Sequence, residues 1–164
     1  MDGIRAYWSK SHLYTRHGTK LNSPEWFTKG LPQNCLDGEL WIGRRTSSYD
    51  VLASIYSKHS NRWKEIGYYV FDLPSSPTVY EDRMNELETL KPLLPHHVHI
   101  VHCLKCQGNS HLMDYLDSIT ENEGEGVMVR QPQTIYSTGV TSSLLKVKVN
   151  PHPLRISHLE VRRY

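Results

Sequence analysis

The sequence predicts one α+β domain in which mostly antiparallel β-sheets are flanked by helices. The chain of 164 residues is long enough for one hydrophobic core and short for two domains. Segments typical of strands outnumber those typical of helices, and loops as well as helices separate successive strands. Such spacing favours antiparallel sheets over a regular alternation of strand and helix.

Six short apolar segments, each bounded by Gly, Pro, Asn or charged residues, are predicted to be strands. They are residues 4–8, 36–42, 66–73, 98–104, 126–130 and 144–149. In the last segment Lys146 and Lys148 alternate with Leu145, Val147 and Val149. The two lysines therefore share one face of the strand, where they could bind a phosphate or protect an exposed sheet edge.

Residues 81–95 predict the clearest helix, because their apolar side chains recur at helical spacing. Glu81 and Asp82 suit its first turn, and Pro95 suits its end. A second helix is expected over residues 112–119, after a cap at Asn109 or Ser110, and a shorter third one over residues 52–56.

The composition is typical of a soluble globular protein, with 38% hydrophobic and 22% charged residues. A net charge of +2 permits a nucleic-acid partner without requiring one. No apolar run reaches the roughly 20 residues that cross a bilayer, and no secretion signal opens the chain. We therefore expect an intracellular protein with no membrane partner; three cysteines also favour a reducing compartment.

Two strings near the start could bind anions. In MDGIRAYW, Gly3 stands between Asp2 and Arg5, a pattern that could hold a polyphosphate or form a turn leading into a strand. In LYTRHGTKL, Arg16 stands beside a glycine that allows close approach to an anion. An ordinary hairpin turn with solvated charges explains the second string equally well.

Three further strings carry acidic or aromatic residues at strand positions. LDGELWIGR places Asp37 and Glu39 on one strand face, where they could bind a divalent metal or a ribose, or form the solvated side of a sheet. YYVFDLP places Phe71 beside Asp72 at a strand end, and EGEGVMVR places Glu125 just before an apolar strand. Each signal alone is modest.

The order of these elements resembles that of the covalent nucleotidyltransferases: K-x-D-G-x-R, an arginine turn, D-G-E, an aromatic residue, E-G and K-x-K. The likeness is closest to ATP-dependent DNA ligases of the minimal bacterial type, whose strings are similar to WFTKGLPQNCLDGELWIGR and YYVFDLP here. The resemblance implies an adenylation domain over residues 1–150, with an ATP-grasp-like fold of antiparallel sheets flanked by helices. Residues 151–164 would form a divergent tail.

The resemblance implies a monomeric enzyme that seals nicks in double-stranded DNA during repair, replication or recombination. Such an enzyme transfers AMP from ATP to the 5′-phosphate of the nick with Mg²⁺ or Mn²⁺. Arg5 and Arg16 would hold phosphates, with Arg16 at the nick. Glu39 would contact the ribose or help to place a metal, and Phe71 would stack on adenine.

The remaining implied roles belong to residues near the C-terminus. Glu125 would take part in metal binding, and Lys146 with Lys148 would grip the α-phosphate. The expected catalytic set is Arg5, Glu39, Glu125, Lys146 and Lys148. Cations around an anion suit attack on a phosphoryl group, which needs charge neutralisation more than proton transfer.

In that family a lysine two residues before the motif aspartate attacks ATP and forms lysyl-AMP. That aspartate is Asp2 here and Met1 precedes it, so we expect the printed chain not to adenylate itself. We also expect it to lack the OB-fold domain that follows in the ligases. The alternatives are a truncated record of a working ligase and an inactive module that binds ATP or nicked DNA.

Two other hypotheses are weaker. An RNA ligase or an mRNA-capping guanylyltransferase shares the chemistry, but the LDGELW and LLKVKV strings look more like those of DNA ligases. A zinc site could use a cluster of histidines and cysteines, although a lone C-x-x-C is only half a site and a structural role is favoured. The cluster consists of His96, His97, His99, His102, Cys103 and Cys106.

Overall fold

The computed structural model describes residues 1–57, 60–149 and 159–163 and confirms the predicted α+β class. The five-stranded first sheet has the order β2–β1–β3–β4–β5, and the second has the order β6–β7–β8. All described strand pairs are antiparallel except β4 with β5. The strands are β1 (Ile4–Trp8), β2 (Leu13–Thr15), β3 (Leu36–Trp41), β4 (Gly67–Asp72), β5 (Val98–Ile100), β6 (Val127–Arg130), β7 (Leu144–Val149) and β8 (Leu159–Arg163).

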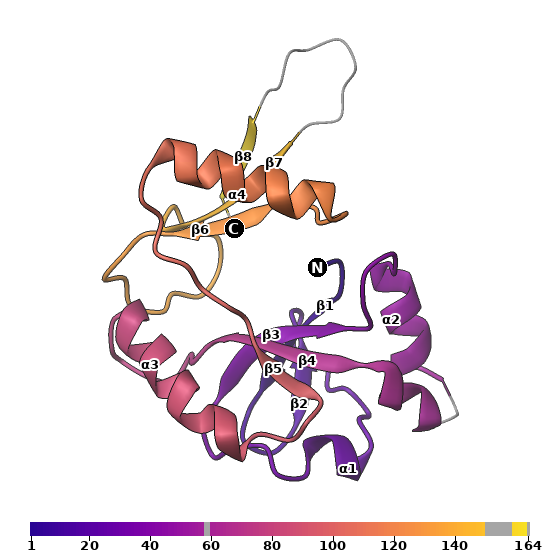
Figure 1. Ribbon diagram of the computed structural model, residues 1–164. Helices are drawn as coiled ribbons and strands as arrows, with labels where there is room; N and C mark the ends of the chain where they lie inside the picture. Colours follow the sequence, from indigo (N-terminus) through magenta and orange to yellow (C-terminus); the bar gives the residue numbers. More distant parts are fainter. Residues whose placement is uncertain (58–59, 150–158, 164) are drawn as a thin grey trace.

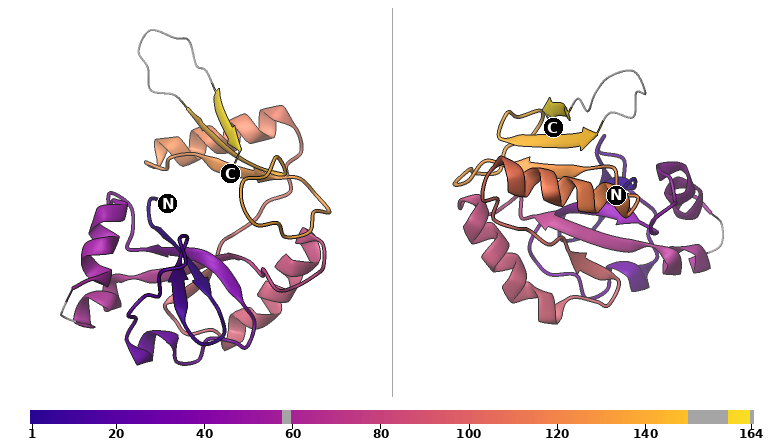
Figure 2. Two further views of the ribbon diagram at one scale, coloured as in Figure 1. Left: turned by 180° about the vertical axis from the view of Figure 1, so that it is seen from behind. Right: turned by 45° about the horizontal axis from the view of Figure 1, so that its top comes forward.

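Helices lie outside both sheets (Figure 1). The α-helices are α1 (Glu25–Thr28), α2 (Ser48–Ile55), α3 (Tyr80–Leu90) and α4 (Asn109–Glu121), and the 3₁₀ turns are η1 (Ser60–Glu65) and η2 (Lys91–Leu93). Helix α4 covers the second sheet, while the other helices surround the first (Figure 2). No helix in the described part of the chain is long and apolar enough to cross a membrane.

The predicted elements agree with the structure except at several boundaries. The helix expected over residues 81–95 is α-helical only to Leu90 and continues as η2, because Pro92 has no N–H to continue an α-helical ladder. The strand expected over residues 98–104 ends at Ile100. Strand β8 pairs with β7 within the predicted tail, whereas residues 150–158 and 164 of that tail lie outside the described residues.

The main core lies on one face of the first sheet. It contains Ala6 and Trp8 from β1, Leu36 and Leu40 from β3, and Val70 from β4, all buried. A smaller core joins α4 to the second sheet through buried side chains, namely Leu116, Val127 and Val147. Because side chains alternate along a strand, the residues between these core positions on β1, β3 and β4 point to the opposite face of the sheet.

His97 ties the short helix α1 to this core. Its ring packs against Trp26 and Phe27, and its Nε2 donates a hydrogen bond of 2.8 Å to the carbonyl oxygen of Phe27. Burial lowers the pKa of His97, and its Nδ1 is buried without a hydrogen-bond partner in the described structure. A neutral ring fits this position, because a charged one would leave a buried N–H unsatisfied.

Candidate nucleotide-binding site

Polar and aromatic side chains occupy the open face of β1, β3 and β4. Arg5 lies directly opposite Glu39 in the antiparallel pairing of β1 with β3. Asp37 precedes Glu39 by two residues on β3, and Phe71 lies on β4. The two-residue period of the strands brings all four side chains to one surface, as the sequence pattern predicted for the two acids.

Arg5 and Asp37 form a fork-like ion pair on this surface. Arg5 Nε and Nη2 donate to the two carboxylate oxygens of Asp37 at 3.1 and 2.7 Å. The Asp37 side chain is only 3% exposed, against 33% for that of Arg5. Asp37 therefore does not belong to the solvated side of the sheet, which was one of the open interpretations. Its hydrogen bonds and charge raise the pKa of Arg5, so this guanidinium stays charged.

The hydrogen bonds of Arg5 leave part of its guanidinium unused. They run through Nε and Nη2, and no hydrogen bond within residues 1–57 and 60–149 uses Nη1. A guanidinium has five N–H donors in a rigid fork, so Arg5 can hold Asp37 on one side and receive an anion on the other.

Glu39 is held by the backbone of the N-terminal string. Its Oε1 accepts a hydrogen bond of 2.7 Å from the N–H of Gly3. A Cβ at Gly3 would collide with the carbonyl oxygen of Leu40, so glycine is required for this approach. Burial is the largest influence on Glu39 and raises its pKa, against the opposing effects of the Gly3 N–H and of Lys146.

Phe71 stands at an irregularity in β4. The register pairs Asp37 with Asp72 but the next residue, Gly38, with Val70, so Phe71 is an extra residue relative to β3. Such bulges redirect a side chain and occur often beside functional sites. The guanidinium carbon of Arg5 lies 5.8 Å from the centroid of the Phe71 ring.

The second sheet contributes Glu125 and Lys146. Lys146 Nζ lies 3.2 Å from a carboxylate oxygen of Glu125, which stands just before β6. Gly126 follows Glu125 with a φ of 151°, and a Cβ there would collide with the carbonyl oxygen of Val147. Val147 packs against α4, so Lys146 and Lys148 lie on the other face of β7, as the alternation predicted.

Charges on the second sheet influence the pKa of Glu39 on the first. Besides burial, the positive charge of Lys146 lowers and the negative charge of Glu125 raises the pKa of Glu39. Glu39 lies on β3, Glu125 stands just before β6, and Lys146 lies on β7, so the charges that act on Glu39 come from residues far from it in sequence. Among the residues that the structure describes, no group of three or more His, Cys, Asp or Glu forms a ready-made metal site.

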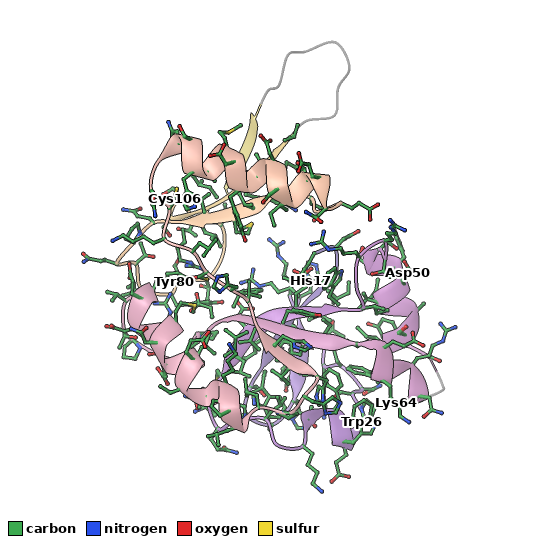
Figure 3. The ribbon with its side chains drawn as sticks, in the orientation of Figure 1. His17, Trp26, Asp50, Lys64, Tyr80 and Cys106 are labelled. Atoms are coloured by element: carbon green, nitrogen blue, oxygen red, sulfur yellow. The ribbon has the colours of Figure 1, made fainter. Side chains whose placement is uncertain are left out.

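Arg16 lies apart from these ion pairs. It is exposed in the turn after β2, where Gly18 has a φ of 79° and its N–H donates to the carbonyl of Thr15. This is the hairpin turn that the sequence allowed. Figure 3 places His17, the next residue, on the side of the first sheet that is turned toward the second.

A buried cluster that the sequence did not predict joins the two sheets. Asp72 Oδ1 accepts a hydrogen bond of 2.6 Å from Arg83 Nε, and Asp72 Oδ2 lies 3.2 Å from Arg130 Nη2 of β6. The Asp72 and Arg83 side chains are both 0% exposed. The Tyr80 ring lies against both guanidinium groups, at 4.7 Å from that of Arg130. This cluster fixes β6 relative to β4.

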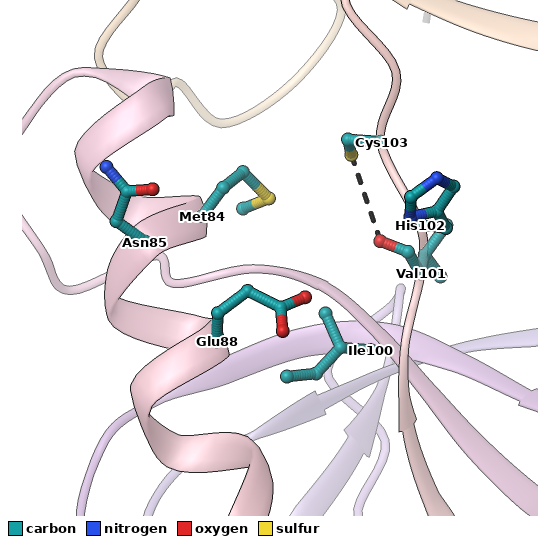
Figure 4. Close-up of a pocket in the computed structure, with 7 residues that line it drawn as sticks. All are labelled: Met84, Asn85, Glu88, Ile100, Val101, His102 and Cys103. Carbon is teal, nitrogen blue, oxygen red and sulfur yellow. Dashed lines mark hydrogen bonds between the residues drawn. The ribbon is translucent and has the colours of Figure 1, made fainter.

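A small pocket lies elsewhere, between α3 and the segment after β5 (Figure 4). It has a volume of about 250 Å³, and its lining includes Met84, Ile100 and Cys103. Cys103 lies 2.8 Å from the hydroxyl of Tyr80. None of the residues predicted to bind the nucleotide lines this pocket, although two members of the histidine and cysteine cluster, His102 and Cys103, do.

The comparisons with known proteins show to which family the chain belongs. The family model described as ATP dependent DNA ligase domain matches residues 2–148. The chain belongs to the ATP-dependent DNA ligase family. It is 32% identical over 152 residues to a DNA ligase of Haemophilus influenzae, covering 90% of this chain and 55% of that ligase.

The chain is also similar to a solved structure. That structure comes from a structure–function study of Lig E DNA ligases, which describes DNA binding with a minimal scaffold. The TM-score is 0.83 at 33% identity, and the match covers 90% of this chain and 59% of the solved one. The chain thus spans somewhat more than half the length of both relatives. The adenylation-type fold inferred from the sequence is confirmed.

Glu39→Gln is expected to stabilise this ligase-family fold at neutral pH. Because its folded pKa is raised above 4.5, the protonated form is favoured by folding, and this contribution is lost as the pH rises through the folded value. Glutamine removes the charge while still accepting from Gly3. We expect the unfolding temperature at pH 7 to rise by a few degrees, since about 1 kcal/mol shifts it by about 2–4 °C.

Thermal unfolding followed by circular dichroism between pH 3.5 and 7.5 checks this expectation. The difference between wild type and E39Q should disappear at the acidic end, where the wild-type residue is also neutral. Glu65→Gln is the matched control, because Glu65 is exposed. An E39Q variant that is less stable than wild type at pH 7 would show that the Glu39 charge supports the fold.

Proposed function

We propose that this chain forms the nucleotidyltransferase part of an ATP-dependent DNA ligase and transfers AMP from ATP to the 5′-phosphate of a nick in duplex DNA. Nick sealing of this kind serves DNA repair, replication and recombination. The observation that carries the proposal is that Arg5 and Glu39 lie on the open face of the first sheet, while the charges of Glu125 and Lys146, paired on the second sheet, act on Glu39. The family membership supports the same reaction.

The nucleoside would bind over the open face of the first sheet. Phe71 is half-buried at the β4 bulge, so its ring can offer a face to adenine. Glu39 is held by Gly3 through one carboxylate oxygen, and its other oxygen can accept a hydrogen bond from a ribose hydroxyl. These two contacts would orient the base and the sugar.

The phosphates would lie among the cations of both sheets. Lys146 and Lys148 share a face of β7. Arg5 on β1 would donate to the phosphates through Nη1, because its Nε and Nη2 donate to Asp37. Lys146 would exchange Glu125 for phosphate oxygens as ATP enters, because both partners are acceptors for the same ammonium group. Neutralisation of negative charge at the α-phosphate is the main requirement for attack there.

Glu39 and Glu125 would hold Mg²⁺ or Mn²⁺ together with the phosphates. Two carboxylates fit this role, because Mg²⁺ is usually bound by one or two carboxylates plus phosphate oxygens and water. The negative charge of Glu125 is among the influences that raise the pKa of Glu39, which supports placing both carboxylates beside one metal ion. When bound, the metal would supply positive charge beside the transferred phosphoryl group.

Nicked duplex DNA is the proposed partner, bound by a monomer. The solved relative comes from work on DNA binding by Lig E ligases, which supports DNA as the macromolecular substrate of this family member. Arg16 is exposed on the turn after β2 and would contact the phosphate at the nick. Phosphate contacts of this kind predict binding that weakens as the salt concentration rises.

The test is the sealing of a nick that already carries 5′-AMP, with Mg²⁺ present. This step needs no attack by a lysine on ATP, so it tests the proposed site separately from self-adenylation. We expect sealing that Arg16→Ala reduces at least tenfold, since charge-assisted hydrogen bonds contribute about 1.5–3 kcal/mol. Gel separation of labelled nicked and sealed strands measures the rate.

Lys10→Ala serves as the matched control, because Lys10 lies in an exposed turn before β2. Failure to seal the adenylated nick, combined with retained ATP or nicked-DNA binding, would replace this proposal by that of an inactive binding module. Tighter binding of GTP than of ATP would instead favour the capping type of nucleotidyltransferase.

A further inference from the structure

The loop between β6 and β7 reaches from the second sheet to the site on the first. Tyr136 lies in this loop, half-buried between exposed neighbours. Its hydroxyl donates a hydrogen bond of 2.9 Å to Asp37 Oδ2, across 99 residues of sequence. The same hydroxyl lies 3.4 Å from Arg5 Nη2. Tyr136 therefore touches both members of the ion pair at the site.

The position of Tyr136 is fixed by contacts of its neighbours with α3. The N–H of Gln133 donates to the carboxylate of Glu81 at 3.0 and 3.1 Å. The carbonyl oxygen of Thr134 accepts a hydrogen bond of 3.0 Å from Arg83 Nη1. Because Arg83 is fully buried, this anchor is rigid, and the loop can deliver the hydroxyl to a defined point.

We propose that Tyr136 is a positioning residue for nucleotide binding, which acts by holding Asp37 and thereby the guanidinium of Arg5. This inference rests on the proposed function. Asp37 Oδ2 receives hydrogen bonds from both Arg5 and Tyr136, so the carboxylate is fixed from two directions. With Asp37 fixed, the unused Nη1 edge of Arg5 keeps one direction toward the nucleotide.

The protonation of Tyr136 suits this role. Burial and the nearby Asp37 carboxylate raise the pKa of Tyr136 to about 12, so the hydroxyl remains a donor at neutral pH. A phenylalanine would keep the ring and lose only the hydrogen bonds. Tyr136→Phe therefore tests the contribution of the hydroxyl to the position of the Arg5–Asp37 ion pair, while the packing of the ring in the loop is kept.

The experiment measures the dissociation constant of ATP with Mg²⁺ by isothermal titration calorimetry. We expect Y136F to weaken ATP binding about threefold to tenfold, in line with the loss of one hydrogen bond to a charged group. The matched control is Tyr49→Phe, because Tyr49 on α2 is 79% exposed. Thermal unfolding of each variant shows that it is folded at the temperature of the titration.

A double-mutant cycle with Arg5→Lys distinguishes positioning from a purely structural effect. If Tyr136 acts through Arg5, the same Y136F change should weaken ATP binding less than twofold once Arg5 is lysine. An equal loss in both backgrounds would overturn the inference, because Tyr136 would then act independently of Arg5. Tight wild-type binding that Y136F leaves unchanged would overturn this inference alone. A wild-type chain that fails to bind ATP would overturn the proposed function itself.

Discussion

Replacement of Asp72 by asparagine is expected to lower the free energy of unfolding by about 3–5 kcal/mol, the usual cost of removing one partner from a buried ion pair. Asp72 and Arg83 are both fully buried, and Leu73 N–H also donates to Asp72 Oδ1 at 2.8 Å. Asparagine offers one acceptor oxygen in place of two and leaves the Arg83 guanidinium without a negative partner. Arg130 would lose the same partner.

Urea denaturation followed by intrinsic tryptophan fluorescence measures this loss. Glu88→Gln is the matched control, because Glu88 pairs with Lys91 on the surface of α3 and η2, where both side chains are more than half exposed. That variant should cost about 0–1 kcal/mol. Equal midpoints for D72N and E88Q would contradict the view that the Asp72 cluster holds the two sheets together.

Replacement of Lys146 by methionine is expected to weaken ATP binding about tenfold to a hundredfold, corresponding to roughly 1.5–3 kcal/mol for a charge-assisted contact. Methionine keeps the length of the apolar stem and removes the ammonium group. The Lys146 side chain is 24% exposed, so its charge acts in a partly desolvated site, where electrostatic contacts are stronger than in water.

Calorimetric titration with ATP and with adenosine separates the phosphate contact from the rest of the site. K146M should weaken ATP binding and leave adenosine binding within about twofold, because adenosine has no phosphate for the lysine to contact. Lys105→Met, in the exposed segment between β5 and α4, is the control. Equal losses for ATP and adenosine would show that Lys146 supports the fold of the site and not the phosphate.

Periodicity predicted the elements on which the site is built. Alternation along residues 144–149 put Lys146 and Lys148 on one face, and β7 has this arrangement. The two-residue spacing of Asp37 and Glu39 predicted that both acids share one strand face, and both lie on the open face of β3. The roles of Arg5, Glu39, Phe71, Glu125, Lys146 and Lys148 came from the resemblance to the ligases and stay predictions.

The sequence could not predict contacts that depend on tertiary structure. Asp72 looks like an ordinary strand-end residue, and only the fold brings Arg83 and Arg130 to it. Tyr136 lies in a polar loop with no periodic pattern, far in sequence from Asp37. Strand β2 has three residues, too few to show alternation, and β8 owes its existence to pairing with β7.

The most direct test of the proposed site is an amide NMR titration of the chain with ATP and Mg²⁺. We predict that the largest shift changes will fall on Gly3 and Phe71, beside the site residues of the first sheet, and on Gly126 and Lys146, at the ion pair of the second. Shift changes concentrated instead on Met84, Ile100 and Cys103, around the pocket beside α3, would contradict the assignment of the nucleotide site.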